Sequence, residues 1–306
     1  MSAKYFQVAQ GVWGLKQYFV NVYMIANRRS AGKGWVLVDT GIKGSEKDII
    51  AAAEKLFGPG TRPAAIVLTH GHADHSGSIK ELLKHWNVPV YAHKLEIPYL
   101  TGLSSYPPAD PGVGGGLMTM LSWIWPVKPI NISRNLREID MYEGIPELPE
   151  WKVIHTPGHT PGHISLFLPL NTTLIAGDAF TTTVTESATY LLGNIKHISG
   201  PPKYITTDWK AAEHSVRELA ELQPRIAATG HGPVMRGREL TTALNQLSED
   251  FKTLALPENG RYVKRAAIAD ERGVRYVPPV KVGAKQTIGF AAAASVAAFL
   301  LVRSLW

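Results

Sequence analysis

Six consecutive residues, 70–75, carry three histidines and one aspartate in the order His-Gly-His-Ala-Asp-His. They follow an apolar run, 65–68, which predicts a buried strand that ends in a tight loop. His70 and His72 can converge on one cation, whereas Asp74 and His75 extend past them towards a second. Imidazole and carboxylate groups are typical ligands of zinc and related divalent metals. The hexapeptide therefore predicts part of a metal centre, with solvated loop histidines as the alternative.

Three later segments have the same form, in which a histidine or aspartate stands beside glycine at the end of a short apolar run. Glycine at such a point lets the backbone turn sharply and approach a metal closely. The segments are 155–163 with His159, 174–178 with Asp178, and 226–233 with His231. Together, the four clusters predict one edge of a sheet system that is lined with metal ligands.

The order His-x-His-x-Asp-His, followed by His, Asp and His, resembles the metallo-β-lactamase superfamily of hydrolases. Val38-Asp39-Thr40-Gly41 is similar to the second-strand signature of that family. The resemblance covers about residues 5–245, which is most of the chain. It implies an α/β fold, namely a four-layer αββα sandwich.

The resemblance also implies a role for each member of the candidate centre. The first metal would be held by His70, His72 and His159, the second by Asp74, His75 and His231, and Asp178 would bridge the two. Asp39 and His163 would lie behind these ligands, where such residues orient imidazole rings and set their tautomers.

Two adjacent divalent metals, most simply Zn²⁺ with Fe or Mn as alternatives, lower the pKa of a shared water, so that hydroxide is present at neutral pH. We expect this metal-bridged hydroxide to attack the carbonyl of a lactone, ester or thioester. Asp74 is the candidate acceptor of the water proton, and Tyr190 is a candidate substrate contact from its position alone. The chain has no cysteine, which excludes thiolate ligands and cysteine nucleophiles.

The substrate class stays open among relatives with different reactions. Asp178 distinguishes the chain from the β-lactamases, which resemble it but lack the bridging aspartate. Residues 156–163, Thr-Pro-Gly-His-Thr-Pro-Gly-His, are similar to both lactonases and glyoxalase II enzymes. The latter bind glutathione with a helical C-terminal domain, which is not expected after His231, so a lactonase-like hydrolase is favoured. A glyoxalase II-type thioester hydrolase and a persulfide dioxygenase with one iron are the alternatives.

Apolar spacing and turn residues predict a strand-rich chain with interspersed helices. The expected strands are 18–25, 34–38, 65–69, 88–92, 151–155, 164–168, 174–176 and 226–229, and the expected helices are 45–57, 76–86, 211–222 and 237–254. Residues 97–130 break this alternation with prolines and glycines and then an apolar stretch, 118–125. We expect a segment that covers the substrate, with a short packed helix as the alternative.

The 306 residues divide into a predicted hydrolase domain, 1–256, an extension and linker, 257–284, and an apolar helix, 285–306. Residues 286–302 carry no charge and would span roughly 25 Å as a helix, so this tail is a candidate membrane anchor. The N-terminus lacks a signal-like apolar core, which favours the cytoplasm, with the tail as an attachment to the inner face of the membrane. The net charge of +7 is spread along the chain, so we expect a small-molecule substrate and no nucleic acid, while the oligomeric state stays open.

Overall fold

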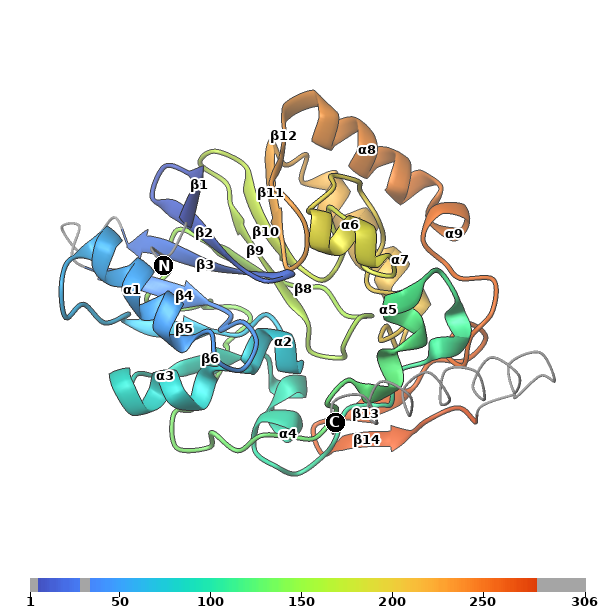
Figure 1. Ribbon diagram of the computed structural model, residues 1–306, viewed down its shortest axis with the longest axis horizontal. Coiled ribbons are helices and arrows are strands. Elements are labelled where there is room, and N and C mark those ends of the chain that lie inside the picture. The colour runs from blue at the N-terminus through green and yellow to red at the C-terminus, as the bar shows by residue number, and fades with distance from the viewer. Residues whose placement is uncertain (1–4, 28–33, 280–306) are drawn as a thin grey trace, which may run out of the picture.

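Two β-sheets face each other in the computed structural model, which describes residues 5–27 and 34–279 (Figure 1). The first sheet has seven strands in chain order: β1 (Tyr5–Ala9), β2 (Val12–Gln17), β3 (Val20–Asn27), β4 (Gly34–Val38), β5 (Ala65–Val67), β6 (Val90–Ala92) and β7 (Leu136–Glu138). The second has five strands in the order β12 (Met235–Arg236), β11 (Ile226–Thr229), β10 (Thr173–Gly177), β9 (Ile164–Leu168) and β8 (Lys152–His155).

The alternation of side chains along a strand builds the layers on both faces of each sheet. In β4, Trp35 and Leu37 face an outer core beneath α1 (Glu46–Phe57) and α3 (Ile79–Trp86), whereas Val36 and Val38 enter the core between the sheets. The second sheet packs its outer face in the same way on α7 (Trp209–Glu221) and α8 (Gly237–Glu249). These helix and sheet layers confirm the predicted αββα sandwich.

The four predicted clusters follow strands from both sheets. The segment 70–75 follows β5 and enters the short helix α2 (Ala73–Ser76), and the segment 156–163 connects β8 to β9. Asp178 comes directly after β10, and His231 comes two residues after β11. Because β10 and β11 are parallel neighbours, their carboxyl ends lie side by side and bring these two residues together.

Residues 97–130 form short elements rather than one long helix. They include α4 (Ile97–Leu100), α5 (Leu117–Met120) and 3₁₀ turns at Pro111–Val113 and Ser122–Ile124. On one side this segment meets the residues just before α6 (Ala188–Gly193), where the backbone N–H of Met118 donates to the carbonyl of Glu186. On the other side it meets a hairpin of β13 (Ile268–Asp270) and β14 (Gly273–Tyr276), where Val274 N donates to Ser104 Oγ.

The chain after α8 continues into α9 (Phe251–Leu254) and then into the β13–β14 hairpin. The hairpin falls within residues 257–284, for which no strands were predicted, and the domain boundary at residue 256 stays a prediction. Within the described part of the chain, no helix is long and apolar enough to cross a membrane. The proposed apolar tail, 285–306, lies outside the described residues.

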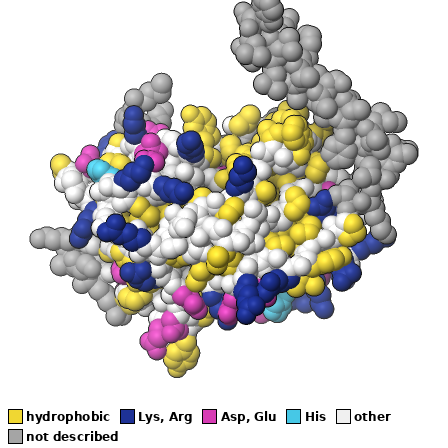
Figure 2. Space-filling model, turned by 90° about the horizontal axis from the view of Figure 1, so that it is seen from below, with side chains coloured by type: hydrophobic (Ala, Val, Ile, Leu, Met, Phe, Trp, Pro, Cys, Tyr) yellow, Lys and Arg dark blue, Asp and Glu magenta, His cyan; other side chains and the backbone are white. Residues whose placement is uncertain are grey.

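Basic side chains are dispersed over the face shown in Figure 2, where Lys and Arg lie in several separate places among hydrophobic and acidic groups. The same face carries scattered hydrophobic side chains, which are normal on a folded protein.

Candidate metal centre

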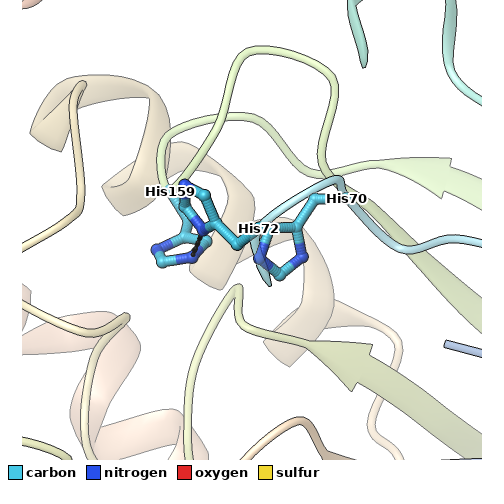
Figure 3. A group of neighbouring side chains, drawn as sticks. All are labelled: His70, His72 and His159. Atoms are coloured by element: carbon cyan, nitrogen blue, oxygen red, sulfur yellow. Dashed lines mark hydrogen bonds between the residues drawn. The ribbon is translucent and has the colours of Figure 1, made fainter. Parts of the chain in front are cut away.

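The first group of candidate ligands joins the two histidine-rich loops. One ligand atom each from His70, His72 and His159 lies within 4.8 Å of the others, and all three side chains are buried. His72 Nδ1 is 3.0 Å from His159 Nε2, close to the ~3.3 Å that separates two nitrogen ligands around a tetrahedral zinc ion. Figure 3 shows the three rings gathered from two separate loops. The arrangement offers three nitrogen atoms to one cation.

A second group lies beside the first. Ligand atoms of Asp74, His75 and His231 are also within 4.8 Å of one another. His231 Nε2 lies 3.4 Å from Asp74 Oδ2. This group mixes one carboxylate with two imidazoles, a ligand set suited to zinc, iron or manganese.

Asp178 stands between the two groups. Its Oδ2 atom lies 3.5 Å from His159 Nε2 on one side, and 3.5 Å from His75 Nε2 and 3.2 Å from His231 Nε2 on the other. Its Oδ1 atom is buried and has no hydrogen-bond partner in the described structure, and the same holds for His70 Nε2. Buried polar atoms normally have partners. Unpartnered acceptors at the junction of the two groups therefore fit a site for cations.

Glycine allows this close approach at residue 230. A Cβ atom on Gly230 would collide with Asp178 Oδ1 and with the His75 ring. The backbone N–H of Gly230 donates to the carbonyl of Gly177, which ties the two ligand-bearing strand ends together. The glycine that precedes His231 is thus required by the packing of the centre, as the sequence predicted.

Hydrogen bonds behind the centre orient the imidazole rings. Asp39, which has a left-handed backbone (φ 60°), accepts from Thr69 N and Thr69 Oγ1 and lies 2.8 Å from His75 Nδ1. His231 Nδ1 lies 2.9 Å from the Phe19 carbonyl, to which it can donate. In both histidines Nδ1 is engaged, so Nε2 faces the centre and is free to bind a metal.

His163 lies behind the centre and belongs to none of the ligand groups. Its Nε2 accepts a hydrogen bond from Asp178 N at 2.8 Å, and its Nδ1 lies 2.8 Å from Thr156 Oγ1. Both ring nitrogens are therefore engaged, and the imidazole fixes the backbone on which the Asp178 carboxylate stands.

Burial and charge set the proton affinities of the metal-free centre. Burial lowers the pKa of His70 and lowers that of His72 to about 4, so both rings are neutral at pH 7. Burial would also lower the pKa of His231, but the carboxylates of Asp178 and Asp74 raise it to about 10. In turn, His231 and His75 hold the pKa of Asp178 well below its usual range despite its burial. The metal-free centre thus combines neutral imidazoles at His70 and His72 with a protonated imidazole at His231, which the carboxylates stabilise.

A narrow cavity of about 20 Å³ opens onto the candidate ligands. Apart from the candidate ligands, the cavity is lined mainly by apolar side chains from the segments 125–126 and 202–205. Trp125 contacts Phe19 edge to face, with ring centroids 5.7 Å apart, and stacks with Tyr204 at 6.5 Å. The lining residues are His72, Ala73, Asp74, Trp125, Pro126, His159, Asp178, Pro202, Tyr204, Ile205 and His231.

The expected substrate contact, Tyr190, is not among the cavity-lining residues. It lies on α6 and its ring contacts His197 instead. The tyrosine that lines the cavity is Tyr204. Position in the chain after Asp178 could not separate these two tyrosines, because the intervening loop determines which one faces the ligands.

Sequence reasoning also missed Glu96, a fully buried carboxylate that contacts both histidine loops. The only local signal is its place in a charged stretch, Lys94-Leu95-Glu96, which reads as exposed. Trp125 had a stronger signal, since it ends the apolar stretch in the segment that was expected to cover the substrate.

Comparisons with known proteins agree with this geometry. The family profile of the Metallo-beta-lactamase superfamily matches residues 15–231. A Bacillus subtilis protein described as probable metallo-hydrolase YflN is 42% identical over 249 residues, which cover 81% of this chain and 94% of that protein. A hydroxyacylglutathione hydrolase of Alkalilimnicola ehrlichii is 34% identical over 120 residues, or 39% of this chain and 34% of that enzyme.

The fold has counterparts among solved structures at low sequence identity. An archaeal metallo-beta-lactamase superfamily protein from Sulfolobus tokodaii matches with a TM-score of 0.54 and 18% identity over 92% of this chain and 94% of its own. The profile match spans every residue from His70 to His231, and the Bacillus relative covers most of both chains. The protein therefore belongs to the metallo-β-lactamase superfamily.

Proposed function

We propose that this protein is a dinuclear metal-dependent hydrolase that attacks the carbonyl carbon of a lactone, ester or thioester and breaks its acyl C–O or C–S bond. The observation that carries the proposal is the position of Asp178 Oδ2, within 3.5 Å of histidines from both ligand groups. A carboxylate has two oxygens and a negative charge, so it can serve two adjacent cations and reduce their mutual repulsion. Zn²⁺ suits the nitrogen-rich ligand set best, with iron or manganese as alternatives.

The candidate ligands would have two roles, binding of the two cations and removal of a proton from water. His70, His72 and His159 would hold one cation and Asp74, His75 and His231 the other, with Asp178 between them. When bound, the two cations would lower the pKa of a water and polarise the substrate carbonyl. Asp74 lines the cavity and is a carboxylate at neutral pH, which supports a role as acceptor of the water proton.

Tyr204 takes the substrate-contacting role first considered for Tyr190. Burial, together with the nearby charges of Asp74 and Glu186, raises the pKa of its phenol well above the usual value. The hydroxyl therefore stays protonated at neutral pH and can donate a hydrogen bond to a carbonyl oxygen in the cavity. Trp125 and Ile205 would pack against the acyl part of the substrate.

Metal content tests the proposal directly. Elemental mass spectrometry of the purified protein should find about two divalent metal ions per chain, and a panel of lactones, esters and thioesters should contain a substrate. About one iron per chain would favour the persulfide dioxygenase alternative. A chain that holds no metal after reconstitution would reject both.

Among carbonyl substrates, a glutathione thioester has one supporting observation, the partial match to a hydroxyacylglutathione hydrolase. That match covers only 34% of the enzyme, so it supports thioesters as part of the panel. A panel member with a glutathione leaving group, paired with a simple alkyl thioester, separates recognition of glutathione from recognition of the acyl group.

Trp125→Ala should raise KM for substrates with long apolar acyl groups by about tenfold, because such a loss of apolar contact is worth ~1.4 kcal/mol. Metal content should be unchanged. Trp123→Ala is the matched control, since Trp123 is 54% exposed and does not line the cavity. Steady-state kinetics over a series of acyl lengths measures the effect, and equal changes in both variants would contradict a role for Trp125 in the substrate site.

A further inference from the structure

We infer that the carboxylate of Glu96 positions both histidine loops of the metal centre and thereby sets its metal affinity. This inference rests on the proposed metal-dependent function. Glu96 is not a candidate ligand and does not line the cavity. Its side chain is fully buried at the start of α4, behind the two loops.

The two oxygens of Glu96 divide their hydrogen bonds between the loops. Oε2 accepts from the backbone N–H of Gly71 at 3.0 Å, and Gly71 stands between His70 and His72. Oε1 accepts from Thr160 Oγ1 at 2.7 Å and from Gly162 N at 2.9 Å, and Thr160 directly follows His159. One side chain thus fixes the backbone beside all three members of the first ligand group.

Tyr106 extends this contact to the ring of a candidate ligand. Its hydroxyl donates to Glu96 Oε2 and accepts from Gly71 N at 2.9 Å. Its ring packs against the His72 ring, with centroids 4.5 Å apart. A Cβ on Gly71 would lie 2.5 Å from the Tyr106 hydroxyl oxygen, so the loop closes onto this tyrosine only because residue 71 is glycine.

The carboxyl group of Glu96 is buried among neutral groups, and this burial raises its pKa. In the described part of the chain Glu96 has no ion pair, and all of its hydrogen-bond donors are neutral. A buried carboxylate without a cation is costly unless several donors satisfy it. The four donors come from the two histidine loops and from Tyr106, so the groups that stabilise the carboxylate are those whose positions define the metal centre.

Glu96→Gln tests this role at nearly constant volume. The amide keeps one oxygen but turns an N–H₂ group towards donors of one loop, so that loop loses its acceptor. We expect the dissociation constant for zinc, measured by competition with a chromogenic chelator, to rise about 10- to 100-fold, the range seen when residues that orient metal ligands are changed. The absorption spectrum of the cobalt-substituted protein should change as well, because it reports ligand geometry.

Two stacked tyrosines provide a matched pair of variants. Tyr99 and Tyr106 stack at 3.9 Å, but only the Tyr106 hydroxyl bonds to Glu96, and the Tyr99 hydroxyl has no partner in the described structure. Tyr106→Phe and Thr160→Val each remove one donor and should weaken zinc binding several-fold, whereas Tyr99→Phe should not. These two single-donor variants also decide the question if Glu96→Gln fails to fold.

The outcomes separate this inference from the proposed function. Wild-type zinc affinity and an unchanged cobalt spectrum in a folded Glu96→Gln protein would overturn the positioning role while leaving the metal centre intact. Unchanged affinity in both Tyr106→Phe and Thr160→Val would overturn it too. A wild-type protein that binds no metal would remove the proposed function, and this inference with it.

Discussion

Asp178→Asn should reduce the metal content to one ion or less per chain and lower kcat/KM on the order of 10³-fold, equivalent to about 4 kcal/mol. The substitution keeps the shape of the side chain but removes the charge that lies within 3.5 Å of histidines in both groups. Without that charge, the repulsion between two adjacent cations would no longer be reduced. One of the two cations would therefore bind much more weakly than the other. Elemental mass spectrometry and kinetics on the same preparation measure both effects.

Asp208→Asn is a suitable control for this substitution. Asp208 caps the N-terminus of α7 by accepting from Lys210 N and Ala211 N, and asparagine caps helices about equally well. This variant should keep its metal and activity. Should Asp178→Asn hold wild-type metal at wild-type affinity, Asp178 would not be a bridging ligand.

The metal-free protein should be most stable near pH 6.5 and lose stability in both directions. His231 has a folded pKa raised to about 10, so its contribution is complete below the unfolded value of about 6.5 and is lost as the pH rises towards 10. His72, with a folded pKa lowered to about 4, contributes above pH 6.5, and this is lost as the pH falls towards 4. His163, lowered to about 3, acts in the same direction as His72.

Thermal unfolding of chelator-treated protein measures this dependence. We expect Tm to fall on the order of 5–10 °C between pH 6.5 and 9.5. Each ~1 kcal/mol lost from the free energy of unfolding lowers the Tm of a domain of this size by a few degrees. Zinc should abolish the alkaline decline, because the bound cation replaces the proton between His231 and the carboxylates. His231→Gln should also flatten it, whereas His85→Gln, at an exposed position, should not. If Tm of the His231→Gln variant falls at alkaline pH as much as that of the wild type, groups other than His231 cause the decline.

The parts of the fold that could be predicted are those with strong local patterns. The strand 34–38 was predicted with its observed bounds, because its residues are apolar on both faces and turn residues precede it. The helix over 45–57 was predicted to within one residue, because Ile49 and Ala53 recur at helical spacing. The predicted ligand residues come together in space because each follows a strand whose apolar run was visible in the sequence.

The missed elements are those whose form depends on distant partners. β1 and β2 pair with each other and extend the first sheet, but the glycines at positions 11 and 14 interrupt their apolar pattern. The Gly14 position is filled from across the pair, because a Cβ there would collide with the Phe6 ring. The β13–β14 hairpin is short and mixes apolar with charged residues, and its bond to Ser104 has no counterpart in the local sequence.

The site shows the same division between local and distant information. The ligand candidates in residues 70–75 can be recognised from residue type and spacing. The role of Glu96 can be recognised only from its tertiary contacts with residues 71 and 160–162. Tyr190 and Tyr204 are the same residue type, and both follow Asp178 in the chain. Only the path of the loop between them decides which tyrosine lines the cavity. Sequence patterns thus identified the candidate ligands, and tertiary contacts were needed to find the residues that support them.

Every ligand group in this protein draws on both sheets, since residues 70–75 follow β5 in the first sheet, while His159, Asp178 and His231 follow or join strands of the second. A nascent chain that has been synthesised only as far as β7 therefore lacks a complete ligand group. If the centre binds metal as proposed, tight binding would require both halves of the chain to have folded and docked. We expect a chain cleaved between the sheets to lose metal when its fragments separate, so metal content would distinguish an intact molecule from a cleaved one.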